Sequence, residues 1–204
     1  SEITYCLNDY FAGRCKITQA TYDVGTRKAM EQGLVMKQRG QVLLSPASSK
    51  VGDIVGALRQ QYNFDQLNDG LESLEQHYQP DVILLDNMAG VNEETMLSIA
   101  ACDEMVLLLH PDQQDYQGTA VVLEVARNLK VTGLHLVLNN APASLDLEKA
   151  RLQLEQVYKC EDAMILPHSE ELAAMGSAEV LAWKQPEAAI VPLIEQLARR
   201  LWAG

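Results

Sequence analysis

Short apolar runs alternate along this chain with stretches in which apolar residues recur every three or four positions. The runs are typical of buried strands, and the second spacing is typical of amphipathic helices. The predicted strands are 41–44, 82–85, 105–109, 134–138 and 163–166. The predicted helices are 51–58, 67–77, 93–100, 117–129, 147–157, 170–175 and 192–202. This alternation predicts an α/β fold with a mostly parallel, doubly wound sheet flanked by helices.

The first forty residues are less regular than the rest. They predict short helical pieces at 8–11 and 17–22 and an edge strand at 33–37. Further along, Asn92, Asp146 and Ser169 each stand directly before a predicted helix, where a side-chain oxygen can cap the first turn. Since the chain has no linker or low-complexity tract, we expect residues 1–204 to form a single domain.

The central feature is the segment Asp81-Val82-Ile83-Leu84-Leu85-Asp86, in which four apolar residues lie between two acids. Such a run is typical of a strand buried on both faces. In open α/β sheets, ligands bind at the carboxyl ends of the strands. Asp86 occupies that position, where a carboxylate can hold a water molecule on Mg²⁺. The alternative is that Asp86 only caps a turn.

Other predicted strands also end in polar residues. Asn139 follows one strand, Pro167-His168-Ser169 follows another, and His110-Pro111-Asp112 follows a third. The carboxyl ends of parallel strands gather at one edge, so these residues can line one site. Gly90 lets its amide approach a terminal phosphate, and the carboxamide of Asn139 can contact a base edge. Together these features favour nucleotide chemistry.

Composition narrows the possible partners. The chain has a net charge of −12, and an acidic surface repels polyanions, so DNA is a disfavoured partner. Its 4 cysteines form no CxxC pair and no zinc-like spacing, and because the sequence shows no signal peptide, we expect the reducing cytoplasm. A metal site built from the 4 histidines is a weaker alternative, because they are far apart in the sequence. There is no apolar run of about 18 residues, the length of a membrane span.

Four tracts resemble the MinD/ParA group of P-loop ATPases: 81–95, 107–119, 136–140 and 166–169. The resemblance covers about residues 40 to 200 and implies a SIMIBI-type P-loop NTPase fold that binds ATP and Mg²⁺. It implies that Asp86 is the Walker B acid, holding Mg²⁺ through water. It also implies that Ala89 and Gly90 sense the γ-phosphate. Asn139 would then lie beside the adenine, and the loop at Pro167 and His168 would cover the base.

The sequence departs from this family in two places. Asn87-Met88 stands where Ser or Thr followed by Pro is usual. The P-loop motif G-x-x-x-x-G-K-S/T occurs nowhere, and 13–18 matches it only superficially. The resemblance therefore implies that an N-terminal strand–P-loop–helix unit, on the order of 30 or more residues, is absent from this chain. Either the chain is part of a longer protein, or it is a degenerate relative. ATP hydrolysis is expected of an intact protein and not of this chain alone.

Two functions follow from these observations. The resemblance implies the first, an ATPase that acts as a spatial switch in positioning, partitioning or cell division. It would form a homodimer around ATP and recruit a regulatory or cargo protein, in the cytoplasm or at the inner face of the membrane. The second is a nucleotide-free binding or scaffold module that retains the fold. The last helix, with Arg199 and Arg200 beside an apolar face, suits either a membrane interface or the core, and the core is favoured.

Overall fold

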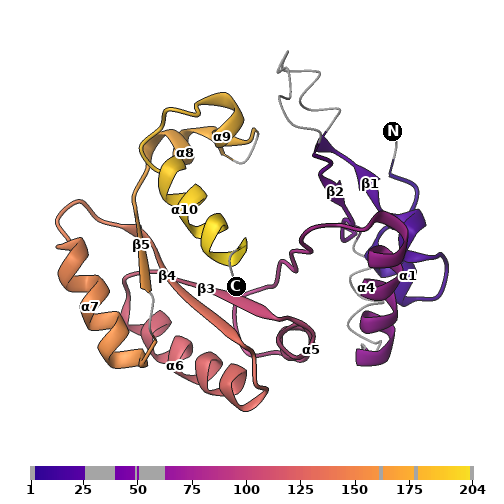
Figure 1. Ribbon diagram of the computed structural model, residues 1–204, viewed down its shortest axis with the longest axis horizontal. Helices are drawn as coiled ribbons and strands as arrows, with labels where there is room; N and C mark the ends of the chain where they lie inside the picture. Colours follow the sequence, from indigo (N-terminus) through magenta and orange to yellow (C-terminus); the bar gives the residue numbers. More distant parts are fainter. Residues whose placement is uncertain are drawn as a thin grey trace. The chain divides into compact units, whose positions relative to one another are not determined.

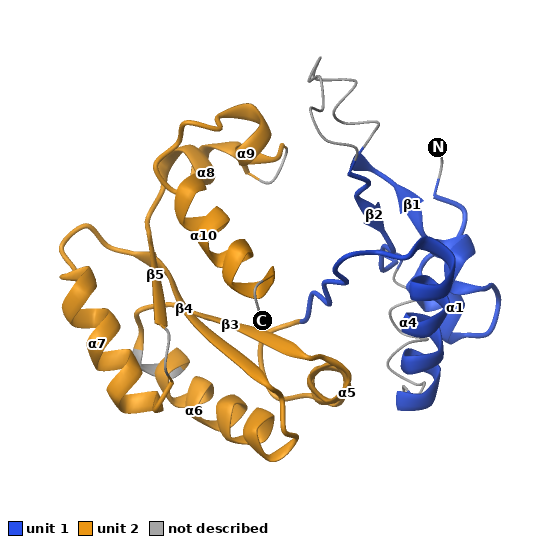
Figure 2. Ribbon diagram, viewed as in Figure 1, with its two compact units in different colours: residues 1–87 blue, residues 88–204 orange. Residues whose placement is uncertain are grey.

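The computed structural model describes residues 3–25, 40–48, 50, 63–160, 163–176 and 179–202. The chain divides into two compact units, Ser1–Asn87 and Met88–Gly204 (Figure 2). The predicted edge strand at 33–37 and the predicted helix at 51–58 lie outside the described residues. The single domain expected over residues 1–204 stays a prediction.

Unit 1, Ser1–Asn87, contains small helices and a short two-stranded ribbon. Its described elements are α1 (Leu7–Phe11), the 3-10 helix η1 (Ile17–Ala20), β1 (Tyr22–Asp23), β2 (Leu43–Leu44) and α4 (Phe64–Tyr78). β1 and β2 pair in antiparallel fashion, with Tyr22 opposite Leu44. The Tyr22 hydroxyl accepts hydrogen bonds from the amides of Thr4 and Tyr5 at 3.0 and 2.9 Å. Of the strand predicted at 41–44, only Leu43–Leu44 is present, and it lies in an antiparallel ribbon.

Helix α4 packs on the beginning of the chain. Its Gly70 lies so close to Tyr10 and Ile17 that an added Cβ would stand 3.0 Å from both side chains. The Tyr10 hydroxyl donates to the Gln66 carbonyl at 2.6 Å. The helix ends at Tyr78, as the nearby Pro80 predicts, and Gln79 caps it with a left-handed φ of 48°.

The strand predicted at 82–85 is wrong. No secondary structure is assigned there, and the side chains of Val82 and Leu84 are 53% and 82% exposed. The described strands pair only as β1 with β2, β3 with β4 and β4 with β5, so none of them forms a ladder with this segment. An apolar run predicts a tendency to be buried, but a strand also needs neighbours for its backbone groups.

Unit 2, Met88–Gly204, is built on a parallel sheet with the strand order β3-β4-β5 (Figure 1). Its strands are β3 (Glu104–Leu109), β4 (Gly133–Ala141) and β5 (Ala163–Pro167). Helices α6 (Gln113–Asn128) and α7 (Leu147–Tyr158) connect them, and α5 (Glu93–Ala101) precedes them. After the sheet come α8 (Glu170–Met175), α9 (Leu181–Lys184) and α10 (Val191–Trp202). The predicted α/β fold with a parallel sheet is confirmed, whereas α9 was not predicted.

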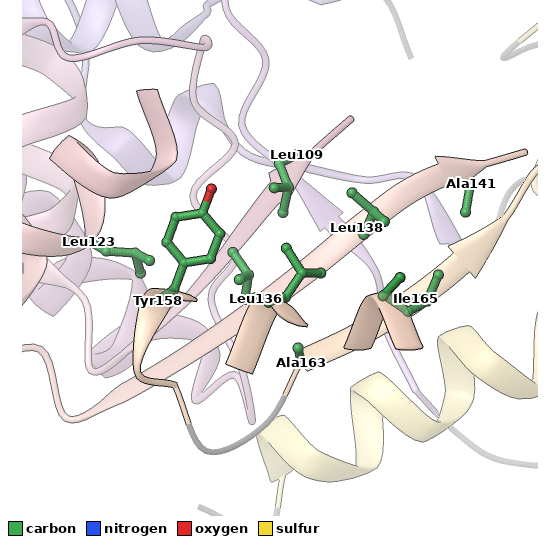
Figure 3. Packing of buried hydrophobic residues seen from close by; sticks show 10 residues of the cluster. Leu109, Leu123, Leu136, Leu138, Ala141, Tyr158, Ala163 and Ile165 are labelled. Atoms are coloured by element: carbon green, nitrogen blue, oxygen red, sulfur yellow. The ribbon is translucent and has the colours of Figure 1, made fainter. Parts of the chain in front are cut away.

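Apolar side chains fill both faces of this sheet. On one face, Leu136 and Leu138 belong to a cluster with Leu109 and Ile165, which α6 and α7 complete through Leu123 and Tyr158 (Figure 3). The other face carries a cluster from β4, β5, α9 and the start of α10, comprising Val137, Met164, Leu166, Leu181, Ala188, Ile190 and Val191. Helices thus cover the sheet on both sides.

The C-terminal helix α10 packs on this second cluster. Its Leu193 and Leu197 lie against the buried residues. This is the core position that the sequence favoured over a membrane interface. Among the described residues, no helix is long and apolar enough to cross a membrane.

All three predicted helix caps are present. Asn92 Oδ1 accepts a hydrogen bond from the Thr95 amide at 2.8 Å. Asp146 and Ser169 accept from backbone amides in the first turns of α7 and α8 at 3.1 and 3.2 Å. The caps fix where the helices begin, and the Ser169 cap starts α8 directly after the carboxyl end of β5.

Candidate functional site

A cavity of about 540 Å³ lies at the carboxyl ends of β4 and β5, within unit 2. Its lining comes from the last residues of the two strands and from the loops that follow them: Asn140, Ala141, Pro142, Ala143, Pro167, His168 and Glu170. This is the edge of a parallel sheet at which ligands are expected.

A β-bulge shapes the β4 side of the cavity. The β4–β5 register is regular up to Leu138 opposite Ile165, and the next pair is Ala141 opposite Pro167. β4 therefore contains one residue more than β5 over this interval. Asn140 lies in the bulge with a left-handed φ of 59°, which Asn tolerates better than most residues. The bulge brings Asn140 to the cavity wall.

His168 joins the two strand ends. Its backbone amide donates to the Ala141 carbonyl at 2.9 Å, and its Nδ1 lies 2.6 Å from Asn140 Oδ1. Its Nε2 lies 3.4 Å from a carboxylate oxygen of Glu170. The imidazole is thus held between an amide oxygen from the bulge of β4 and a carboxylate from the start of α8.

The start of α8 carries further negative charge. The Ser169 hydroxyl donates to the Glu171 carboxylate at 2.7 Å. This hydrogen bond, with a smaller contribution from the backbone, lowers the pKa of Glu171 below its usual value. Glu171 is therefore ionised at neutral pH, and Glu170 adds a second carboxylate to the same turn.

Not all the predicted base-side residues line the cavity. Pro167 and His168 do, whereas Asn139 is not among the lining residues. The Asn139 side-chain oxygen instead accepts the backbone amide of Asn140 at 2.9 Å. Asn140, which the sequence did not single out, occupies the wall. The Asn-Asn pair marks a place where a turn is favoured, but it does not show which carboxamide reaches the cavity.

The predicted phosphate-side residues are at the surface. Asp86 is exposed near the end of unit 1, and Ala89 and Gly90 are exposed at the start of unit 2. Gly90 has a φ of 102°, a backbone conformation that suits glycine and strains other residues. The roles of these three residues in binding Mg²⁺ and the γ-phosphate stay predictions.

The end of β3 folds back on an acidic side chain. Asp115 accepts from the His110 amide at 2.8 Å and lies 3.3 Å from His110 Nδ1. The Asp115 amide in turn donates to Asp112 at 2.9 Å. These side chains are not among the residues that line the cavity.

The lining suits the base of a nucleotide better than its phosphates. Two proline rings offer apolar surface to a flat ring, and an amide and an imidazole offer polar contacts at its edge. The Glu170 carboxylate would repel a phosphate. No group of 3 or more His, Cys, Asp or Glu in the described part of the chain is arranged to hold a metal ion. A single carboxylate at Asp86 still fits Mg²⁺, which usually keeps several of its water ligands.

Comparison with known proteins finds similarity in solved structures and none in sequence families. No protein-family model and no curated protein matches the sequence. Among solved structures, the MinD cell division protein of Aquifex aeolicus is 15% identical with a TM-score of 0.74, over 100% of this chain and 77% of that one. The same protein is also matched in a MinC:MinD complex.

Two further structures come from other organisms. MinD from Pyrococcus horikoshii OT3, complexed with Mg-ADP, is 18% identical with a TM-score of 0.69, over 97% and 74% of the two chains. A ParA family ATPase from Chlorobium tepidum TLS is 15% identical with a TM-score of 0.66, over 97% and 77%. At these identities the likeness establishes a MinD/ParA-like fold.

Proposed function

Because this chain has the MinD/ParA-like fold, we propose that the protein to which it belongs is an ATP-dependent spatial switch in positioning, partitioning or cell division. The observation that carries the proposal is the cavity at the carboxyl ends of β4 and β5, whose lining suits a purine base. The Mg-ADP in the MinD of Pyrococcus horikoshii supports the choice of nucleotide and metal.

In this proposal the nucleotide has a base side and a phosphate side. The base lies in the cavity, near Asn139 and beneath the loop of Pro167 and His168. On the phosphate side, Asp86 holds Mg²⁺ through water and the amide of Gly90, next to Ala89, senses the γ-phosphate. ATP lies between two protomers, so hydrolysis separates the homodimer. The P-loop amides and lysine would come from a segment that the 204-residue sequence does not contain.

Nucleotide-dependent dimerisation tests this function. The intact protein would be titrated with ATP and Mg²⁺ by calorimetry, and its mass would be followed by light scattering. We expect saturable binding and a shift from monomer to dimer with ATP but not with ADP. Failure to bind ATP, together with an unchanged mass, would contradict the proposal.

The surface on which the switch acts is proposed to be another protein. The MinC:MinD complex of the Aquifex aeolicus neighbour supports a regulatory or cargo partner, and the net charge of −12 argues against DNA. The proposed location is the cytoplasm, with peripheral contact at the inner membrane as the alternative. We expect the chain to stay in solution with anionic vesicles, because Leu193 and Leu197 of α10 pack on the core. Co-sedimentation that is lost when the last eleven residues are removed would favour the membrane.

The alternative function is a binding or scaffold module that works without nucleotide. The absence of G-x-x-x-x-G-K-S/T from the sequence favours it. It predicts a monodisperse 204-residue protein whose melting temperature does not change with millimolar ATP and Mg²⁺. A rise in melting temperature with ATP would exclude this alternative.

A further inference from the structure

The contact between His168 and Asn140 determines which end of the Asn140 side chain is available to a ligand. The two atoms that meet, His168 Nδ1 and Asn140 Oδ1, are 2.6 Å apart. A carboxamide oxygen has no hydrogen, so in this arrangement the imidazole Nδ1 donates and the oxygen accepts. The carboxamide NH₂ group of Asn140 is then the end left for a molecule in the cavity.

Both side chains are held in place from their backbones. The backbone of Asn140 is fixed in the bulge by its left-handed φ of 59° and by the hydrogen bond that its amide donates to the Asn139 side-chain oxygen. The bond from the His168 amide to the Ala141 carbonyl, at 2.9 Å, fixes the backbone of His168 beside it. The carboxamide of Asn140 keeps one remaining freedom, a rotation that exchanges its oxygen and its NH₂ group. An imidazole of His168 whose Nδ1 carries the hydrogen removes that freedom.

We propose that His168 is a positioning residue that orients the Asn140 carboxamide, so that Asn140 presents a hydrogen-bond donor to a purine base in the cavity. The proposal rests on the proposed function in one respect, namely that a nucleotide base occupies this cavity.

The chemistry of adenine matches such a donor. Its unprotonated ring nitrogens accept hydrogen bonds, and its flat faces can pack on the rings of Pro142 and Pro167. An Asn side chain that rotated freely would offer donor and acceptor in turn, and part of its binding free energy would be lost in fixing one orientation. In this role His168 raises affinity by orienting Asn140.

Adenosine binding to the 204-residue chain tests this role, because the nucleoside carries no phosphate and needs no P-loop. Dissociation constants would be measured by NMR titration of ¹⁵N-labelled protein. The variants are Asn140→Ala, His168→Phe, their double variant, and His168→Gln, whose amide can still donate to Asn140 Oδ1. His110→Phe is the matched control, since that imidazole contacts Asp115 and does not line the cavity.

We expect Asn140→Ala and His168→Phe each to weaken adenosine binding by about threefold to tenfold, the range of one neutral hydrogen bond. The double variant should bind no more weakly than Asn140→Ala, because His168 acts through Asn140. His168→Gln should restore binding to within about twofold of the wild type. The imidazole ¹⁵N shifts of His168 should show a protonated Nδ1, and His110→Phe should bind like the wild type.

Three results would overturn the inference. The first is that His168→Phe weakens adenosine binding equally with and without the Asn140 side chain. The second is that His168→Gln does not restore adenosine binding. The third is that the wild type does not bind adenosine. The ATP and Mg²⁺ experiment is judged separately. A protein that dimerises with ATP but ignores adenosine retains the proposed function and loses this inference. A chain that binds adenosine through Asn140 but does not dimerise with ATP retains this inference and loses the proposed function.

Discussion

Replacing Leu138 by Ala should destabilise unit 2 by about 2–5 kcal/mol, the range for deleting a leucine side chain from a packed core. Leu138 lies in the middle of the sheet, opposite Leu109 on β3 and Ile165 on β5, and its exposed fraction is 0%. The change removes buried apolar surface and leaves a space that strands on both sides cannot easily close. The loss should therefore fall in the upper part of this range.

Leu108→Ala is the matched control. Leu108 belongs to β3 of the same sheet, but its side chain is 58% exposed. The same chemical change there should cost less than about 1 kcal/mol, because little apolar surface leaves water when the chain folds.

Urea unfolding followed by tryptophan fluorescence measures both variants. The chain has 2 tryptophans, Trp183 and Trp202, and both belong to unit 2, so the signal reports that unit alone. The midpoint should fall strongly for Leu138→Ala and hardly change for Leu108→Ala, with similar slopes in both. Equal losses in the two variants would refute the assigned core.

Three further predictions concern other parts of the chain. Asp86→Ala should abolish ATP hydrolysis by the intact protein while its circular dichroism stays unchanged; normal turnover would remove Asp86 from the site. The thiol and the amide of Cys6 donate to Asp9 and lower its pKa, so the folded state gains stability above the usual carboxyl pKa. That gain should be lost as the pH falls through the lowered pKa. Urea midpoints for Asp9→Asn, followed by circular dichroism because both tryptophans lie in unit 2, should lack this acid dependence, and an unchanged acid dependence would contradict the prediction. Tyr158→Phe should cost about 1–2 kcal/mol by fluorescence, because the Tyr158 hydroxyl donates to the Tyr116 carbonyl at 2.8 Å; an unchanged midpoint would show that this bond adds nothing.

Features that depend on neighbours in the sequence were predictable. The caps at Asn92, Asp146 and Ser169 use side chains that reach the amide three residues ahead, so the local sequence contains all that they require. The three strands of the parallel sheet were also predicted, because their apolar runs are bounded by turns and alternate with helices. Helix α9, only 4 residues long, has too few positions to show a period.

The segment 82–85 shows the limit of this reasoning. Its apolar run is as strong as that of β5, yet it forms no ladder with any described strand. A strand is stabilised by backbone partners that lie far away in the sequence, and the run itself says nothing about where those partners are. The pattern therefore predicted burial correctly for β5 and wrongly for Leu84.

The base side of the candidate site shows a second limit. The sequence predicted that Pro167 and His168 lie at a strand end, and both line the cavity. It singled out Asn139 on β4, whereas the bulge brings Asn140 to the wall. One extra residue in a strand changes which side chain faces a site, and a bulge depends on the register with the next strand. The Asn-Asn pair did not predict that Asn140 has a left-handed φ.

Strand β3 has a consequence for how the protein behaves at high concentration. Among the described strands it pairs only with β4, and Leu108 on it is 58% exposed. A strand edge that pairs with no other described strand and carries an apolar side chain is a template for the edges of other molecules, and so for aggregation. The net charge of −12 opposes such encounters through repulsion between copies. Since salt screens this repulsion, colloidal stability should be greatest in dilute buffer and should fall as ionic strength rises.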